Sequence, residues 1–473
     1  MLSKKFVIGF IPEDDRPVSL YQPYLFCQSA RVNLLIPPQD LLGSRFIKAK
    51  IEDLHLWLEA NFSKASAWVI ALDMLIYGGL LASREWCDSQ EKLEQRLTIL
   101  DKLRLKHKNI KIYGFQSIKR LSGTVQKTDD LAVWQDQMNL FNPQHNRSVI
   151  KLNHQLRDRN LALNLAVINF VGKNKIDFLA LLQEDTSQND LVKKEHAALL
   201  SCIKINKVER KVILTPGTDE GGLVLLVRLI NELRKKAKQK VCVIFANKRG
   251  SNRISLYEDR SIKDSLMGQM RLINAKRIKN PENADFILML WLADEAQKDL
   301  VFEKASTNYK VANQMQRFVA LIKAQLRNTV VLADLRYANG ADPDFLKLLS
   351  KSINLAALKG FSAWNTTGNS LGFALAQGML DLTDQRFLLL RLIEDWGYQS
   401  LVRAKLIDYN DKYLKFDIWN LTLDQKLILE KEMKKSFAVW QKKELSACFS
   451  EKMLKKVKVS LPWQRLFEVK VQV

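Results

Sequence analysis

Residues 178–190 read FLALLQEDTSQND, and this stretch indicates both a class of fold and the place of a site. Its first six residues are almost continuously apolar and have the length of a buried strand. Strands buried on both faces are typical of a parallel sheet that helices cover on both sides. Glu184 and Asp185 follow directly, so adjacent carboxylates are expected at the carboxyl end of that strand, in a chain whose formal net charge is +23.

Nine further short apolar runs alternate with longer amphipathic segments along the chain. The segments at 90–107 (QEKLEQRLTILDKLRLKH) and 311–326 (VANQMQRFVALIKAQL) are typical of the helices between them. The other nine runs are FVIGFIP, VNLLIPP, AWVIALD, IKIYGFQ, KVILTPG, VCVIFAN, FILMLWLA, TVVLADL and LKGFSAW. Strands that alternate with helical crossovers predict an α/β fold with a parallel sheet.

The number of strands leaves two architectures open. Ten candidate strands are more than the eight of one (β/α)8 barrel, so a barrel with additions is the first expectation. The alternative is two doubly wound lobes around a cleft. Residues 126–175 are helix-rich and interrupt the series of strands, and the alternation stops after about Asp381. We therefore expect an α/β catalytic-type domain over residues 1–380 and a basic, mainly helical C-terminal unit over 381–473.

Cysteine and histidine usage argues against two common kinds of site. The cysteines are odd in number and form no CxxC pair, which disfavours a disulfide framework and a cysteine-bound zinc site. The histidines fall on expected helices or loops, which disfavours a histidine metal centre or a Ser-His-Asp triad. These residues are Cys27, Cys87, Cys202, Cys242 and Cys448, and His55, His107, His145, His154 and His196.

The 74 basic residues exceed the 51 acidic ones, which raises the possibility of an anionic partner. The densest basic stretch is residues 430–459, but charge distributed along amphipathic helices is typical of solvated helix faces. Nucleic-acid or anionic-polymer binding stays open as one alternative function. No apolar run is long enough to span a membrane and the N-terminus lacks a signal-peptide pattern, so a cytoplasmic protein is expected.

Polar residues follow seven of the apolar runs at the point where each strand is expected to end. Since parallel strands open their carboxyl ends onto one face, these residues are expected to form one mainly acidic site. A single acid at such a place is often only a helix cap, whereas paired acids exceed what a cap needs. The residues are Asp14, Asp15 and Arg16; Asp73, Tyr77 and Arg84; Glu184 and Asp185; Asp219 and Glu220; Tyr257, Glu258, Asp259 and Arg260; Asp334, Arg336, Tyr337 and Asn339; and Trp364, Asn365 and Asn369.

Clustered carboxylates suit glycoside hydrolysis, because neighbouring acids separate one another's pKa values and one of them keeps a proton. We expect a small-molecule carbohydrate substrate and no cofactor, with Asp185 as the general acid and Glu184 stabilising the developing charge. Trp364 and Asn365 are expected to form a sugar platform. The remaining strand-end residues are expected to bind hydroxyl groups, stack on the sugar or tune the two catalytic acids. The alternative enzyme is a lyase, isomerase or hydrolase for a sugar or sugar phosphate that uses the same acids to hold Mg²⁺ or Mn²⁺.

Six segments of the chain resemble a bacterial family, the domain of unknown function 4127 family. In order they are DDRPV, ALDMLIYGGLLASR, LLQEDTS, TPGTDEGG, YEDRS and KGFSAWNTTGNSLG, and they extend from Asp14 to Gly372. Members tend to carry two aspartates after the glutamine of the third segment, where this chain has Glu184 and Asp185. The resemblance implies no particular reaction, and it implies that the strand-end acids belong to the signature of the family.

Overall fold

The computed structural model describes residues 6–85, 88–122 and 147–473 of the chain. These residues divide into two compact units: unit 1 contains the described residues up to Leu233, and unit 2 extends from Arg234 to Val473. Each unit is built on its own parallel sheet. All ten apolar runs that were expected to be strands are strands, so the α/β class is confirmed.

Unit 1 has a six-stranded sheet in the order β2-β1-β3-β4-β5-β6, and every neighbouring pair is parallel. The strands are short and apolar, and β3, β5 and nearly all of β4 are buried along their whole length. The strand bounds are β1 Val7–Ile11, β2 Asn33–Leu35, β3 Ala67–Ala71, β4 Lys111–Ile118, β5 Phe178–Gln183 and β6 Val212–Pro216.

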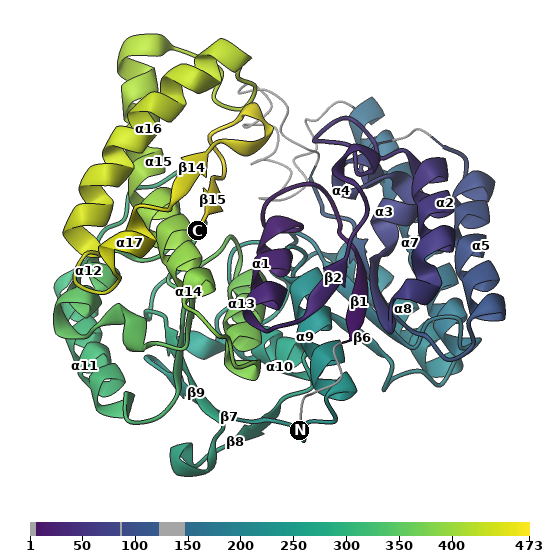
Figure 1. Cartoon of the computed structure of the whole chain (residues 1–473), viewed down its shortest axis with the longest axis horizontal. Coiled ribbons are helices and arrows are strands. Elements are labelled where there is room, and N and C mark those ends of the chain that lie inside the picture. The colour runs from purple at the N-terminus through teal and green to yellow at the C-terminus, as the bar shows by residue number, and fades with distance from the viewer. Residues whose placement is uncertain (1–5, 86–87, 123–146) are drawn as a thin grey trace. The chain divides into compact units, whose positions relative to one another are not determined.

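Helices cover both faces of this sheet (Figure 1). The crossover from β1 to β2 proceeds in one direction along the sheet and all later ones proceed in the other, so right-handed connections put α1 on one face and the later crossover helices on the other. Helix α9 contacts α1, β3 and β4, and therefore belongs to the face of α1. The helix bounds are α1 Tyr21–Ser29, α2 Ile51–Asn61, α3 Leu72–Tyr77, α4 Leu80–Ser83, α5 Gln90–Lys106, α7 Arg147–Gly172, α8 Asp190–Ile205 and α9 Gly221–Leu233.

Unit 2 has a five-stranded parallel sheet in the order β13-β11-β9-β7-β8. Numbered from its own first strand, this order is 2-1-3-4-5, which is also the order of the first five strands of unit 1. Helices α10 and α13 contact each other on one face, and α11 and α12 contact each other in the crossovers that take the opposite direction. The bounds are β7 Lys240–Phe245, α10 Ile262–Leu272, β8 Lys276–Ile278, β9 Phe286–Trp291, α11 Tyr309–Gln325, β11 Val330–Asp334, α12 Pro343–Ser352, β13 Gly360–Ser362 and α13 Thr367–Met379.

The barrel preferred from the sequence is not confirmed, because the described strands form two open sheets and no closed one. The two doubly wound orders agree instead with the alternative of two α/β lobes. The helix-rich segment expected over residues 126–175 contains α7, and residues 126–146 lie outside the described residues.

Residues after 380 form the mainly helical end of unit 2. Helix α14 contacts β13, and the π-helical segment η6 contacts β13 and α12. The division expected at residue 380 stays a prediction. The bounds are α14 Arg386–Arg391, η6 Leu392–Val402, α15 Arg403–Tyr409, η7 Asn410–Leu414, α16 Leu423–Glu444 and α17 Glu451–Leu454, followed by the antiparallel pair β14 Lys458–Ser460 and β15 Lys470–Gln472; the two-residue strands β10 Lys298–Asp299 and β12 Tyr337–Ala338 pair with each other.

Candidate functional site

Strand order indicates where a ligand binds in each unit. In open parallel sheets, ligands bind beyond the carboxyl ends of the strands, at the point where the direction of the crossovers reverses. That point lies between β1 and β3 in unit 1 and between β7 and β9 in unit 2. The strand-end residues expected from the sequence are therefore distributed over two sheets. Those up to Glu220 belong to unit 1, and those from Tyr257 onwards belong to unit 2.

The loop after β1 is held by an arginine between two carboxylates. Arg16 donates from Nε to Asp14 Oδ2 and from Nη2 to Asp219 Oδ1, with both distances 2.8 Å. The side chains of all three residues are at most 8% exposed. Asp14, Arg16 and Asp219 thus do lie together, as the sequence predicted, and they form a buried ion-pair network that fixes the loop after β1 against the loop after β6.

Glu13 lies beside this network and differs from its members in having no side-chain partner in the part of the chain that the structure describes. Its side chain is buried, with the residue 3% exposed, and among the described residues neither carboxylate oxygen has a hydrogen-bond partner. Burial raises the pKa of Glu13 well above its usual value, and the charges of Asp14 and Asp73 raise it further. Burial and these charges therefore favour the protonated form of the group. Sequence reasoning noted the acids after β1 but did not single out Glu13; the available signal was three acids in a row, PEDDR.

Asp73, at the carboxyl end of β3, is the second buried acid at the reversal point. Its Oδ2 accepts hydrogen bonds from the backbone N–H and the hydroxyl of Ser117, both at 2.7 Å, whereas Oδ1 has no partner among the described residues. Burial raises the pKa of Asp73 to about 6, and the bonds from Ser117 oppose that rise. Tyr77, one turn further along α3, is buried with the guanidinium of Arg159 over its ring at 5.0 Å.

A glycine pair brings the loops after β1 and α3 close together. Gly78 and Gly79 have φ angles of +89° and +124°, values that side-chain-bearing residues rarely adopt. A Cβ atom on Gly79 would lie 3.5 Å from the backbone carbonyl oxygen of Glu13. The two glycines therefore allow the left-handed backbone of the turn after α3, and this turn packs directly on Glu13.

Glu184 and Asp185, expected to be catalytic, are ion-paired with arginines. Arg84 contacts Glu184, and Arg120 contacts Glu184 at 3.5 Å and Asp185 at 2.8 Å. Gln183 precedes them and donates from Nε2 to the carbonyl of Glu184 at 2.7 Å, while its Oε1 lies 2.8 Å from Nε2 of the buried His196. The two acids thus lie at the same sheet edge as Glu13 and Asp73, with their charges paired.

Basic residues that sequence reasoning did not select complete this edge. Arg157 on α7 donates from Nη1 to the carbonyls of Lys119 and Arg120, both at 2.9 Å, and pairs with Glu195. Lys119 is 5% exposed. The sequence signal was the pair Lys119–Arg120 directly after the β4 run, at the place where the other strands carry acids. Unit 1 therefore has cations among the acids of this edge, and the expectation of a mainly acidic site stays a prediction.

Glu220 and Asp15 complete the predicted residues of unit 1. Glu220 is fully buried and accepts a hydrogen bond from the backbone of Thr218 at 3.0 Å, immediately before α9 begins. A Cβ on Gly217, whose φ is +132°, would lie 1.9 Å from Glu220 Oε1, so only glycine fits beside that carboxylate. Glu220 therefore shapes the turn after β6, and Asp15 is half-buried at the end of β1.

In unit 2, Glu258 joins two helices. Its carboxylate accepts hydrogen bonds from the backbone N–H of Gly368, in the first turn of α13, and from the hydroxyl of Ser265 on α10. Burial raises the pKa of Glu258 to about 7. The neighbouring Asp259 and Arg260 pair with each other at 2.8 Å. Both carboxylate oxygens of Glu258 accept hydrogen bonds from the protein, and these bonds connect α10 with α13.

Asp334 is likewise engaged by backbone groups. Its two oxygens accept from the N–H groups of Arg336 and Asp342, at 3.1 Å and 2.6 Å, and it is fully buried. Arg336 in turn donates to Asp342 at 2.6 Å and to Glu295 at 2.9 Å. The loop after β11 is therefore closed by its own acids and arginine.

Tyr257, Tyr337 and Asn339 make further contacts within this part of unit 2. The hydroxyl of Tyr257 donates to Asp299 at 2.5 Å, and Asn339 donates to the same oxygen at 2.9 Å. The Tyr337 hydroxyl donates to the carbonyl of Ser306 at 3.0 Å.

The expected sugar platform is covered in the structure. Trp364 is 1% exposed, with the guanidinium of Arg391 at 5.3 Å from the centre of its ring. Asn365 is half-buried with φ +52°, and its carbonyl accepts from the backbone of Asn339 at 2.8 Å. Asn369 forms a capping box with Thr366 at the start of α13. These three residues stabilise the turn from β13 to α13.

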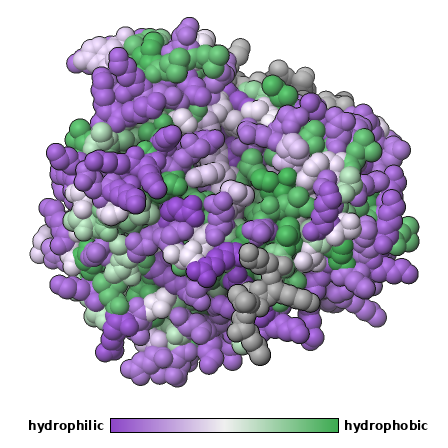
Figure 2. All heavy atoms as spheres, viewed as in Figure 1, coloured by the Kyte–Doolittle hydropathy of each residue, from purple (hydrophilic) through white to green (hydrophobic). Residues whose placement is uncertain are grey.

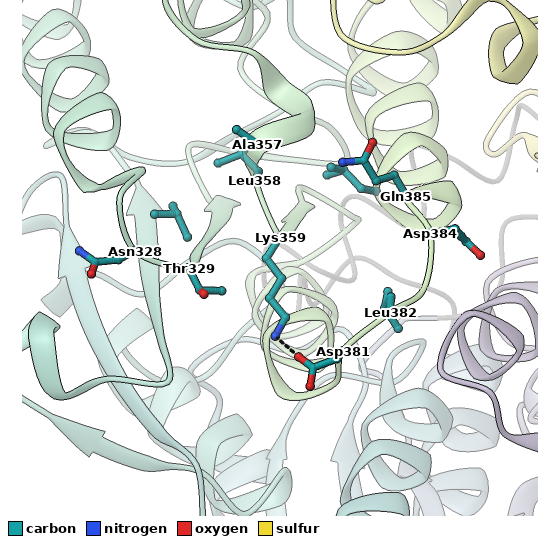
Figure 3. A pocket seen from close by; sticks show the side chains of 11 residues that line it. Asn328, Thr329, Ala357, Leu358, Lys359, Asp381, Leu382, Asp384 and Gln385 are labelled. Atoms are coloured by element: carbon teal, nitrogen blue, oxygen red, sulfur yellow. Dashed lines mark hydrogen bonds and ion pairs between the residues drawn. The ribbon is translucent and has the colours of Figure 1, made fainter. Parts of the chain in front are cut away.

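The cavity in Figure 3 lies at the other edge of the unit 2 sheet. Its volume is about 410 Å³, and it is lined by residues at the start of β11 and before β13 together with the segment 381–388. Lys359 extends toward Asp381 there and pairs with it at 3.1 Å (Figure 3). None of the strand-end residues expected from the sequence lines this cavity.

Further observations concern metals, membranes and the basic C-terminal helices. In residues 6–85, 88–122 and 147–473, no group of three or more His, Cys, Asp or Glu side chains is placed to hold a metal ion. No helix in the same described ranges is both long and apolar enough to cross a membrane. Helix α16 buries Leu429, Met433, Phe437 and Trp440 and exposes most of its lysines. Figure 2 shows hydrophilic residues spread over most of the visible face, with smaller apolar areas between them.

The fold and the residues at its strand ends define a class of protein, one with two doubly wound parallel α/β units and a polar, buried strand-end edge in each. Comparison with family models gives the particular family. The chain matches the family described as protein of unknown function (DUF4127) over residues 8–154 and 145–472, and it belongs to that family. No curated protein matches the chain.

Proposed function

We propose that this protein is a hydrolase that cleaves a glycoside, with the carboxyl-end edge of the unit 1 sheet as its acid–base site. The observation that carries the proposal is the Glu13 carboxyl, which is buried and has no hydrogen-bond partner among the described residues. A buried polar group without a partner lowers the stability of the folded protein, so its presence indicates a functional role. Its position beyond β1, at the reversal point of the sheet, is where doubly wound folds bind ligands.

Glycoside hydrolysis needs a protonated acid next to carboxylates that stay charged. Glu13 supplies the first, since burial and the nearby acids raise its pKa. Asp219, Glu184 and Asp185 are the neighbouring carboxylates in this proposal, and each is ion-paired with an arginine. A carboxylate in such a pair is an acceptor, so the proton-donor role expected for Asp185 passes to Glu13 in this proposal.

Asp73 and the ion-paired acids have complementary roles in this proposal. Asp73, with one oxygen unbonded among the described residues and a pKa of about 6, takes or returns a proton near neutral pH. Glu184 and Asp185 stabilise the positive charge that develops on the sugar ring, with Arg84 and Arg120 fixing their orientation. Each role is assigned to residues at one sheet edge of one unit.

The test compares Glu13→Gln with Asp185→Asn on a panel of aryl glycosides whose leaving groups differ in acidity. Loss of a general acid typically lowers the rate by about 10²- to 10⁴-fold. We expect that loss in Glu13→Gln for phenyl glycosides and a much smaller loss for dinitrophenyl glycosides, whose leaving group needs no proton. Asp185→Asn should lose activity on both kinds of substrate alike, because charge stabilisation is needed whatever the leaving group.

Glu209→Gln is the matched control, since Glu209 is an exposed glutamate of unit 1 and the same carboxylate is replaced by an amide. It should keep the wild-type rate on every substrate. The proposal is wrong if Glu13→Gln keeps the wild-type rate on phenyl glycosides, or if its loss is equally large for both leaving groups.

A further inference from the structure

We infer that Lys119 and the arginines around it bind an anionic group of the substrate, a carboxylate or a phosphate carried by the sugar. The inference rests on the proposed function in one respect only, namely that the ligand is a sugar. It adds the substrate class: an acidic sugar or a sugar phosphate in place of a neutral glycoside.

The first observation is the isolation of the Lys119 ammonium. Lys119 is 5% exposed, and its contacts are made by its backbone, with its N–H donating to Asn160 Oδ1 at 2.9 Å and its carbonyl accepting from Arg157 at 2.9 Å. The ammonium makes no ion pair or hydrogen bond with any residue in the described part of the chain. Buried ammonium groups are normally paired, because burial of an isolated charge is costly.

The second observation is the charge of its neighbours. Lys119 lies among Arg84, Arg120, Arg157 and Arg159, and burial together with these four positive charges lowers the pKa of its ammonium well below the usual value. The nearby carboxylates are already used: Glu184 pairs with Arg84 and Arg120, Asp185 with Arg120, and Glu195 with Arg157. No acid of this group is left for Lys119.

The arrangement is held rigidly by contacts that do not involve the ammonium. Arg157 fixes the carbonyls of Lys119 and Arg120, while Asn160 fixes the backbone N–H of Lys119 and also donates to the carbonyl of Ser117 at 3.2 Å. The cation is therefore positioned by helix α7 without being neutralised. A fixed, unpaired lysine beside fixed arginines is a preorganised site for anionic oxygens.

The burial of this cluster selects a compact anion. The side chains of Arg84, Arg120 and Arg157 are between 3% and 10% exposed. Such a buried cluster suits a single carboxylate or phosphate group at the end of a small molecule. The same edge of the sheet carries Glu13 and Asp73, so an anion bound at Lys119 orients the sugar with respect to the acids.

The experiment measures thermal stability and calorimetric binding of the full chain with inorganic phosphate, glucose 6-phosphate, glucuronate and neutral glucose. Wild type should be stabilised by at least one anion in a concentration-dependent way and unaffected by glucose at the same concentrations. Phosphate and glucose 6-phosphate against glucuronate then distinguish a phosphate group from a carboxylate. Lys119→Met should weaken binding of the stabilising anion by about 10- to 100-fold, the value of a charge-assisted hydrogen bond.

Two further variants separate binding from a merely structural role. Lys119→Met should raise the melting temperature of the unliganded protein, because it removes a buried polar group that has no partner among the described residues. A structural lysine would give the opposite sign. Lys119→Arg keeps a positive charge at this position and should retain most of the anion affinity. If Lys119 acted instead as a proton acceptor, arginine could not replace it.

Lys102→Met is the matched control, because Lys102 lies on α5 of the same unit with a side chain that is 63% exposed. It should leave both anion binding and the melting temperature unchanged. The inference is overturned if no anion stabilises wild type, or if Lys119→Met binds the stabilising anion as tightly as Lys102→Met does.

The outcomes also separate this inference from the proposed function. Glu13-dependent activity on glycosides in a protein that no anion stabilises would retain the hydrolase and remove the anion site. Lys119-dependent anion binding in a protein whose Glu13→Gln variant behaves as wild type on every glycoside would retain the anion site and remove the hydrolase.

Discussion

The first five strands of unit 1 have the same order as the five strands of unit 2, and the two units use the carboxyl ends of their strands differently. In unit 2, five buried acids have both carboxylate oxygens bonded to groups of the protein. These acids are Glu258, Asp299, Asp334, Asp342 and Asp395. In unit 1, Glu13 has neither oxygen bonded and Asp73 has only one bonded, among the described residues.

Clustered acids in an α/β protein differ in role according to whether their carboxylate oxygens are hydrogen-bonded. A buried acid whose oxygens are both bonded stabilises the loop that carries it, and its charge or proton is not available to a ligand. A buried acid without partners lowers stability, and proteins retain such groups mostly where function requires them. The five fully bonded acids of unit 2 therefore indicate structure, and Glu13 and Asp73 at the reversal point of unit 1 indicate chemistry.

The largest expected effect tests the structural half of this comparison. Arg336→Met removes the cation that binds Asp342 and Glu295 while leaving the fully buried Asp342 in place. Removing one partner of a buried pair typically costs about 3–5 kcal/mol in free energy of unfolding. Urea titration followed by tryptophan fluorescence should show that loss.

Arg260→Met is the control for this experiment, since Arg260 pairs with Asp259 and its side chain is 24% exposed. Such a pair should contribute about 0–1 kcal/mol. If Arg336→Met costs no more than Arg260→Met, the strand-end network of unit 2 does not hold the fold, and the contrast between the units is lost.

The sequence was sufficient for the class of the fold and insufficient for its division into two sheets. All ten apolar runs form parallel strands, because continuous burial leaves a clear apolar signal. The passage from β6 through α9 to β7 leaves one sheet and enters the next. In sequence it is an apolar run, a helix and another apolar run, as in any crossover within a sheet. The place where the pairing of strands changes has no local signature, and the barrel was preferred for that reason.

The candidate site was predictable in part for a similar reason. Acids after strands are visible in sequence, and Asp14, Asp73, Glu184 and Asp219 do lie at the carboxyl edge of one sheet. Whether an acid is bonded or free depends on tertiary partners such as Arg120, which follows β4 and pairs with Glu184 and Asp185 after β5, and the sequence does not contain that proximity. The sequence therefore placed both Asn369 and Glu184 in the site, although one caps a helix and the other pairs with two arginines.

The second prediction sharpens the functional half of the comparison through pH. Burial raises the pKa of Asp73 from 3.8 to about 6, so the folded state binds this proton more tightly than the unfolded state does. The stability of wild type relative to Asp73→Asn is therefore greatest below pH 4 and falls as pH rises through 6. Between pH 4 and pH 8, wild type should lose on the order of 2–3 kcal/mol of stability relative to Asp73→Asn.

The measurement is the free energy of unfolding of both proteins from pH 4 to pH 8. Asp190→Asn serves as the control of opposite sign, because Asp190 is exposed and a hydrogen bond from Lys193 lowers its pKa. If the difference between wild type and Asp73→Asn stays constant with pH, Asp73 does not hold its proton in the folded state, and unit 1 loses its distinction from unit 2.

The smallest effect is expected at Asn369, which the sequence placed in the substrate site and the structure places in a helix cap. Asn369→Ala removes the side chain that accepts from the hydroxyl of Thr366 at 2.9 Å, and loss of a cap typically costs about 1 kcal/mol. Gln425→Ala removes the corresponding residue of the second capping box, at the start of α16, so the two variants should lose similar stability in urea titrations. Neither should change kcat/KM on a glycoside that wild type cleaves. A helix cap contributes to folding and does not contact the substrate in the transition state. A large loss of kcat/KM in Asn369→Ala alone, at unchanged stability, would therefore mean that this strand end of unit 2 binds substrate.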